Sequence, residues 1–139
     1  MKIAGVVVLY NPIIFQVLDN IKSYINTLDI LYVFDNSENI NFNQDELQSF
    51  SDKIKYITYN DNRGIAYALN YCSQNAYNNG YEWMLTMDQD SSFPLPNGFE
   101  QYLDSIKNNF NSKRAFFSPK FKGELPNSPQ FYTSGALMN

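Results

Sequence analysis

Residues 83–91 read WMLTMDQDS, a short and mostly apolar run that leads directly into two aspartates. A run of this length, bounded by polar residues, is typical of a buried strand in a parallel sheet. Ligands bind outside the carboxyl ends of the strands in such sheets. Asp88 and Asp90 therefore stand where a functional site is expected, provided that similar runs elsewhere in the chain build the rest of the sheet.

Similar apolar runs alternate along the chain with segments of helical periodicity. The runs predict strands over residues 3–9, 30–34, 54–59, 83–87 and 115–118, and residues 131–139 resemble the entry to a further strand. The periodic segments predict helices over residues 13–27, 46–50, 65–78 and 98–110, with Gly80 as a left-handed cap after the third of them. This alternation is typical of βαβ units, so we expect an α/β fold with a mostly parallel sheet flanked by helices.

Length and composition indicate one globular unit. The chain has 139 residues, of which 44% are hydrophobic and 17% charged, and this balance excludes a disordered chain, a collagen-like repeat and a coiled coil. The sequence contains no internal repeat and no linker that would separate two domains. We therefore expect residues 1–139 to form a single domain or one part of a larger domain.

The residue types that are missing exclude several kinds of chemistry. The sequence contains no histidine, which excludes catalytic triads with a histidine base and metal sites built on imidazole, so a metal site must use carboxylate oxygen. Cys72 is the only cysteine and cannot form an internal disulfide, which favours a reducing, cytoplasmic compartment. Its place on the apolar side of a predicted helix indicates a core thiol rather than a nucleophile.

Charge and hydropathy limit the partners of the protein. The net charge of −4 argues against nucleic acid, whose phosphate backbone attracts clustered basic residues. The apolar N-terminus is too short to span a bilayer, and no run of 18 apolar residues follows it, so no transmembrane helix is expected. Peripheral association with a membrane stays open.

Asp88 and Asp90 can approach one hard cation because a single residue separates them at the end of a strand. Mg²⁺ and Mn²⁺ prefer such oxygen ligands, and they also take phosphate oxygens of a bound substrate. The alternative is a solvated acidic turn, since aspartate is common in turns.

Polar residues also follow the other predicted strands. Tyr10 and Asn11 follow the first strand, and Asp35 follows the second, where it could accept hydrogen bonds from a nucleobase or a ribose. An Asx turn with the next two residues is the simpler explanation of Asp35. Arg63 could bind a diphosphate together with the helix N-terminus that follows Gly64, or it could be an exposed side chain beside that helix.

As an ordered set, these segments resemble the amino-terminal half of inverting glycosyltransferases of family two, most closely the bacterial rhamnosyltransferase branch. The similarity covers residues 3 to about 92, and residues 133–135 resemble a later strand-entry motif of the family. The matching segments are, in order, Val7-Val8-Leu9-Tyr10-Asn11-Pro12, Val33-Phe34-Asp35-Asn36-Ser37, Asn62-Arg63-Gly64-Ile65-Ala66-Tyr67-Ala68-Leu69-Asn70 and Trp83-Met84-Leu85-Thr86-Met87-Asp88-Gln89-Asp90-Ser91.

The resemblance implies a GT-A (Rossmann-like) fold, a nucleotide-diphosphate-sugar donor and a Mn²⁺ or Mg²⁺ ion near the two aspartates. Asp90 would bind the metal, and Asp88 would stand beside it and approach the ribose or the donor sugar. Such a metal neutralises charge that develops on the departing nucleoside diphosphate, which is the part of glycosyl transfer that most needs electrostatic help.

The resemblance also assigns the remaining residues. Tyr10, Asn11 and Asp35 would line the nucleoside pocket, and Arg63 would lie near the base or the diphosphate. Rhamnose activated by thymidine diphosphate (dTDP-rhamnose) is the first candidate donor, because residues 88–91 resemble the rhamnosyltransferase form. A lipid-linked or cell-surface glycan would suit the family as acceptor, and it would place the protein at the cytoplasmic face of a membrane.

Inverting transfer also needs a carboxylate base, which takes the proton of the acceptor hydroxyl. In this family the base follows a later strand, so we expect it beyond Asn139. Glu100, Asp104 and Glu124 are the only acidic residues after Asp90, and the first two fall on the solvated face of a predicted helix. The expectation is therefore the donor half of a catalytic domain, truncated on its C-terminal side and weak or inactive alone.

Two other functions compete with this interpretation. A non-catalytic module that binds nucleotides or nucleotide sugars would keep Asp35, Arg63 and Asp88 but would need no base. A phosphoacceptor receiver-like domain would also have a parallel sheet, but it would place an acidic pair after the first strand, where this chain has Tyr10 and Asn11. Binding of a nucleoside diphosphate together with manganese separates the glycosyltransferase from the receiver.

Overall fold

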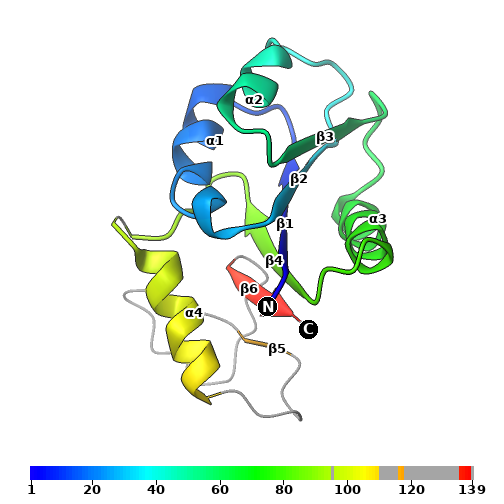
Figure 1. Cartoon of the computed structure of the whole chain (residues 1–139). Coiled ribbons are helices and arrows are strands. Elements are labelled where there is room, and N and C mark those ends of the chain that lie inside the picture. Colours follow the sequence, from blue (N-terminus) through cyan, green and yellow to red (C-terminus); the bar gives the residue numbers. More distant parts are fainter. Residues whose placement is uncertain (95, 110–115, 118–134, 139) are drawn as a thin grey trace, which may run out of the picture.

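The computed structural model describes residues 1–94, 96–109, 116–117 and 135–138. Its strands and helices alternate along most of the chain, as the apolar runs predict (Figure 1). The elements are, in order, β1 (Ile3–Leu9), α1 (Ile14–Ile21), the 3₁₀ helix η1 (Ile25–Thr27), β2 (Ile30–Asp35), α2 (Asp45–Phe50), β3 (Ile54–Thr58), α3 (Ile65–Asn78), β4 (Trp83–Asp88), α4 (Gly98–Asn109), β5 (Phe116–Phe117) and β6 (Ala136–Met138).

The described strands form one sheet in the order β3-β2-β1-β4-β6-β5. Strands β1 to β4 are parallel, whereas β6 pairs antiparallel with both β4 and β5. The expected mostly parallel α/β fold is therefore confirmed. The strand expected over 115–118 is present at its two described residues, and 136–138 form the strand expected near the C-terminus. Residues 115, 118, 131–134 and 139 lie outside the described residues.

Helices cover both faces of the sheet, which gives a three-layer arrangement (Figure 1). Helix α3 covers one face with small side chains, and Ala68 and Cys72 pack there on the large rings of Tyr32 and Phe34. Helices α1, α2 and α4 contribute to the opposite core, which contains the larger cluster of aliphatic and aromatic side chains. Because both faces of the central strands are buried, their sequences are continuously apolar rather than alternating.

The helix predicted over residues 13–27 is wrong in its second half, because α1 ends at Ile21 and η1 follows. Ser23 causes the break. Its backbone N–H donates to the Asn20 carbonyl (3.0 Å), and its hydroxyl donates to the same oxygen (2.7 Å). The N–H of Tyr24 would need that carbonyl in an α-helix, and it donates to Ile21 instead. The tighter turn directs the Tyr24 and Ile25 side chains into the core.

Helix α3 ends at the glycine that the sequence indicates. Gly80 has φ +77°, and its N–H donates to the Tyr77 carbonyl (3.0 Å) while the N–H of Tyr81 donates to that of Ala76 (3.1 Å). This pair of bonds is a Schellman motif, which satisfies carbonyls at the helix end. The motif turns the chain directly into β4.

Gly5 lies in the middle of β1, where the chain has no room for a side chain. A Cβ atom at this position would lie 2.5 Å from Leu28 Cδ1 and 2.9 Å from Leu31 Cδ1. Both leucines are buried in the larger core, so neither can move away into water. The central strand therefore depends on glycine for steric reasons.

Gly5→Ala should lower the free energy of unfolding by about 1–3 kcal/mol, because the added methyl group overpacks the core. Urea denaturation of the variant and the unaltered chain measures this difference. Leu28→Val removes the atom in closest contact, so the double variant should lose less stability than the two single changes predict together. An unchanged urea midpoint for Gly5→Ala would contradict the steric argument.

Candidate functional site

The register of the sheet brings three strand ends together. In β1, Leu9 lies opposite Asp35 of β2, and Val8 lies opposite Asp88 of β4. The Tyr10–Asn11 turn therefore begins between Asp35 on one side and Asp88 on the other. This is the carboxyl edge of the parallel strands, where the sequence predicts the site.

Hydrogen bonds connect the loops that follow β1, β2 and β3. The N–H of Asn36 donates to the Leu9 carbonyl (2.8 Å), and the N–H of Asn11 donates to Ser37 Oγ (2.8 Å). Asn36 Oδ1 also accepts a bond from the backbone N–H of Arg63 (3.3 Å). The loop after β2 thus holds the loops on both sides of it.

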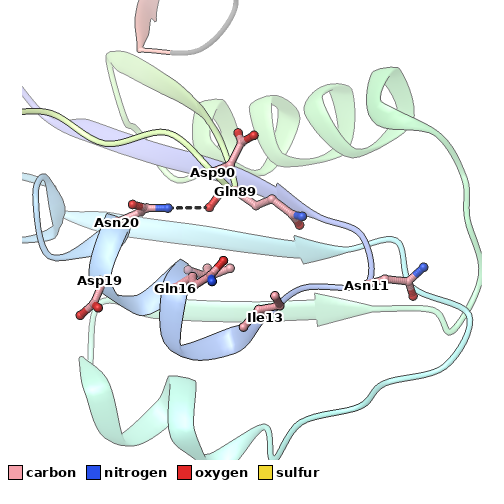
Figure 2. Close-up of a pocket in the computed structure, with 8 residues that line it drawn as sticks. Asn11, Ile13, Gln16, Asp19, Asn20, Gln89 and Asp90 are labelled. Atoms are coloured by element: carbon pink, nitrogen blue, oxygen red, sulfur yellow. Dashed lines mark hydrogen bonds between the residues drawn. The ribbon is translucent and has the colours of Figure 1, made fainter.

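Gln89 makes the corresponding connection from β4. Its side-chain Oε1 accepts a bond from the N–H of Tyr10 (2.8 Å), and its Nε2 donates to the Tyr10 carbonyl (3.3 Å). Its backbone carbonyl accepts a bond from Asn20 Nδ2 of α1 (3.0 Å), which is the dashed line in Figure 2. The turn that carries the two aspartates is therefore fixed both to the β1–α1 turn and to α1.

Two pockets open at this edge of the sheet, and Gln89 lines both. The smaller pocket has a volume of about 280 Å³ and is lined by Val8, Tyr10, Asn36, Asn62, Ile65, Asp88 and Gln89. The larger pocket has a volume of about 480 Å³ and lies beside α1 (Figure 2). It is lined by Asn11, Ile13, Gln16, Val17, Asp19, Asn20, Gln89 and Asp90.

The two aspartates of the strand-end motif line different pockets. Asp88 is half-buried and lines the smaller pocket, whereas Asp90 is exposed and lines the larger one. Within the described part of the chain, no group of three or more His, Cys, Asp or Glu side chains could hold a metal ion. The carboxylate oxygens are hard ligands that fit Mg²⁺ or Mn²⁺, so a cation at Asp90 would take its remaining ligands from water or a bound phosphate.

Asp35 is fully buried, and both of its carboxylate oxygens accept hydrogen bonds from the protein. Oδ1 accepts from the N–H of Ser37 (2.9 Å), which is the Asx turn, and Oδ2 accepts from the hydroxyl of Tyr56 (2.8 Å). Burial of Tyr56 and its bond to the carboxylate raise the pKa of the tyrosine above its usual value. Asp35 does not line either pocket but fixes the turn that does.

The side chain of Arg63 packs against two tyrosines on the surface. Its guanidinium carbon lies 3.8 Å from the ring centre of Tyr59 and 5.2 Å from that of Tyr67, and Nη1 donates to the Tyr67 hydroxyl (3.0 Å). Nε lies 3.8 Å from Asp61 Oδ2. Arg63 therefore contacts the site with its backbone, and its side chain does not line either pocket.

The acidic residues that follow Asp90 do not line either pocket where the structure describes them. Glu100 accepts a hydrogen bond from the Thr27 hydroxyl (2.8 Å), and Asp104 pairs with Lys107 on the same helix (3.5 Å). Glu124 lies outside the described residues. Neither Glu100 nor Asp104 is thus placed as a base for this site.

Sequence reasoning missed the side-chain amides of the site. Asn36, Asn62 and Gln89 occur inside the motif segments but received no role, although each lines the smaller pocket. Tyr56 was also missed. Its signal was weak, because a tyrosine in a strand is usually explained by packing.

The family model named Glycosyl transferase family 2 matches residues 6–121, which include all of these strand ends. The chain belongs to glycosyl transferase family 2. No curated protein sequence matches it. No helix among the described residues of this family member combines the length and the apolar character that a bilayer crossing requires.

Two crystal structures of TarS from S. aureus have the same fold as this family 2 chain. For "Crystal structure of S. aureus TarS" the TM-score is 0.59 at 17% identity, over 78% of this chain and 20% of that one. For "Crystal structure of S. aureus TarS 1-349" the TM-score is 0.59 at 18% identity, over 94% of this chain and 39% of that one. The fold is therefore GT-A, and the chain spans less than half the length of either structure.

Cys72 should react very slowly with iodoacetamide in the folded protein. Burial raises the pKa of its thiol to about 12, so only about one molecule in ten thousand carries the thiolate at pH 8. We expect alkylation at pH 8 to be at least about 100-fold slower in buffer than in denaturant. Mass spectrometry of timed samples measures both rates, and equal rates would contradict a core thiol.

The free energy of unfolding should fall as the pH rises above 10. Tyr56 keeps its proton in the folded chain at a pH where the unfolded chain loses it, so its contribution is complete below pH 10 and decreases above it. Tyr56→Phe should make this decrease less steep, while Tyr24, whose pKa is also raised by burial, maintains part of it. Urea denaturation between pH 8 and pH 11 gives the slope of the unfolding free energy against pH for Tyr56→Phe and for the unaltered chain. Identical slopes would refute the raised pKa of Tyr56.

Proposed function

We propose that this chain is the donor-binding part of an inverting glycosyltransferase, which transfers a sugar from a nucleotide-diphosphate-sugar to a glycan or lipid-linked acceptor. One observation carries the proposal: two pockets that share Gln89 open at the carboxyl edge of the sheet, with one aspartate of the motif in each. Membership of glycosyl transferase family 2 supports a sugar-nucleotide ligand for that edge.

The smaller pocket is the proposed nucleoside site. Tyr10 lines this pocket and is 47% exposed, so its ring is accessible for stacking on a base. Asp88 lines the same pocket, and its carboxylate can accept hydrogen bonds from ribose hydroxyls. Asp35 is buried and lines neither pocket, so in this proposal it acts on the base only through the turn that it fixes. Asn11 continues the site into the larger pocket.

Charge at the site supports a metal cofactor. The described residues that line the two pockets include Asp19, Asp88 and Asp90 but no lysine or arginine. The side chain of Arg63, which the sequence suggested as a diphosphate ligand, lies against two tyrosines. A diphosphate brings further negative charge, so its binding here needs a cation.

We therefore propose that Asp90 holds Mn²⁺ or Mg²⁺. Family 2 glycosyltransferases typically use a divalent metal. Bound at this carboxylate, the ion would neutralise charge on the departing nucleoside diphosphate. Asp88 stays a second candidate ligand, because it belongs to the same turn.

The identity of the donor and acceptor rests on resemblance. Rhamnose from dTDP-rhamnose is the proposed sugar, because residues 88–91 resemble the rhamnosyltransferase form. A lipid-linked acceptor would bring the protein to the inner face of a membrane. The carboxylate base of the inverting step is not assigned to any residue of this chain.

A non-catalytic nucleotide-sugar-binding module is the second candidate. Glu100 accepts a bond from Thr27, and Asp104 pairs with Lys107, so neither is positioned as a catalytic base. A chain without a base would fit such a module. Turnover of a nucleotide sugar by the chain would exclude this module, whereas binding alone fits both proposals.

Asp90→Asn should abolish most of the increase in nucleotide affinity that Mn²⁺ produces, because the amide is a poorer ligand for a hard cation. Isothermal titration of the chain with dTDP and UDP, with and without MnCl₂, measures this increase. Asp35→Ala should weaken binding in both conditions, since it frees the turn that lines the nucleoside pocket.

Asp104→Asn provides a matched control, because Asp104 undergoes the same chemical change on α4, where it pairs with Lys107. The nucleotide affinity of Asp104→Asn should equal that of the unaltered chain both with and without MnCl₂. A manganese effect that survives in Asp90→Asn would refute the metal assignment. If neither nucleotide binds the unaltered chain, the proposed function itself is wrong.

A further inference from the structure

Gln89 makes hydrogen bonds to two other segments of the chain, beyond the bond that closes its own turn. The ladder between β1 and β4 ends at Val8 and Asp88. One residue further on, the side-chain amide of Gln89 pairs with the N–H and the carbonyl of Tyr10, as a neighbouring strand would. The side chain thus extends the pairing of the two strands into their loops.

The backbone of the same residue is fixed from the other side. Its carbonyl accepts the bond from Asn20, and the N–H of Ser91 closes the turn by donating to the Asp88 carbonyl (3.1 Å). Asp90 lies inside this turn, so its backbone is held in place together with that of Gln89. The position of Asp90 and the position of Tyr10 are therefore connected through one side chain.

An uncharged amide of this length suits the connection. Glutamate could accept the bond from Tyr10 but could not donate to its carbonyl, and it would add a third carboxylate beside Asp88 and Asp90. Asparagine is one methylene shorter than the span that Gln89 bridges. Of these three residues, only glutamine has both the donor and acceptor groups and the length that the contact with Tyr10 requires.

We propose that Gln89 is a positioning residue that couples metal binding at Asp90 to nucleotide binding in the smaller pocket. This inference rests on the proposed function. A nucleotide that contacts Tyr10 and a cation that binds Asp90 both favour the arrangement in which Gln89 joins the two turns. In this proposal each ligand strengthens the binding of the other, and linkage requires the two effects on affinity to be equal.

Gln89→Met tests the coupling, because methionine keeps the length and removes both hydrogen bonds to Tyr10. The affinity for dTDP is measured by isothermal titration with and without MnCl₂, and thermal unfolding is followed in parallel. The increase in affinity that Mn²⁺ produces should be about tenfold smaller in the variant, which corresponds to the loss of two ordinary hydrogen bonds. Affinity without Mn²⁺ should fall as well, because Gln89 and Tyr10 both line the smaller pocket, so the ratio of the affinities with and without Mn²⁺ is the quantity that reports the coupling.

Gln101→Met is the matched control, since Gln101 is exposed on α4 and undergoes the same chemical change away from the pockets. It should keep the full effect of manganese. Amide hydrogen exchange gives a second readout that needs no ligand. The Tyr10 amide should exchange faster in Gln89→Met, while the Asn11 amide, which is bonded to Ser37, should keep its rate.

The outcomes are distinct. A full manganese effect in Gln89→Met would overturn the coupling and leave the proposed function intact, even if the variant were less stable. An unchanged exchange rate at Tyr10 would overturn the hydrogen-bonded connection. Absence of dTDP binding by the unaltered chain would refute the proposed function together with the coupling.

Discussion

Parallel pairing of β1 with both β2 and β4 is the constraint on which the rest of the structure depends. It brings the ends of three strands to one edge in a fixed register, with Leu9 opposite Asp35 and Val8 opposite Asp88. The loops then bind one another through side chains, since Ser37 accepts from one loop and Gln89 pairs with the same loop from the other side. The site is therefore a network of loops whose geometry follows from the sheet.

The same constraint explains why the site is acidic. Asp88 and Asp90 are covalently continuous with β4, so they must stand at the edge wherever β4 pairs with β1. Arg63, the one arginine among the described residues, interacts with Tyr59, Tyr67 and Asp61 and lines neither pocket. An anionic ligand at this edge would consequently depend on an added cation, and an uncharged ligand would not.

Much of the fold could be predicted because the central strands are buried on both faces, which makes their apolar runs continuous. The break after α1 could not, since it depends on the side chain of Ser23, which donates to Asn20 and accepts from the N–H of Phe93. The edge that carries the site follows from topology alone. The roles of Asn36 and Gln89 do not, because each bonds to a backbone group of another loop, and only the register decides which group lies within reach.

The separation of Asp88 and Asp90 is the clearest case in which local pattern and tertiary structure differ. In an extended strand, residues two positions apart point to the same face, which would bring both carboxylates to one cation. The chain instead turns at Asp88, where the N–H of Ser91 donates to its carbonyl, and the alternation ends there. Asp88 and Asp90 then line different pockets, with Gln89 lining both. An Asp-x-Asp pattern after a strand thus specifies two neighbouring acidic positions, and the turn that follows decides whether they act on one ligand group or on two.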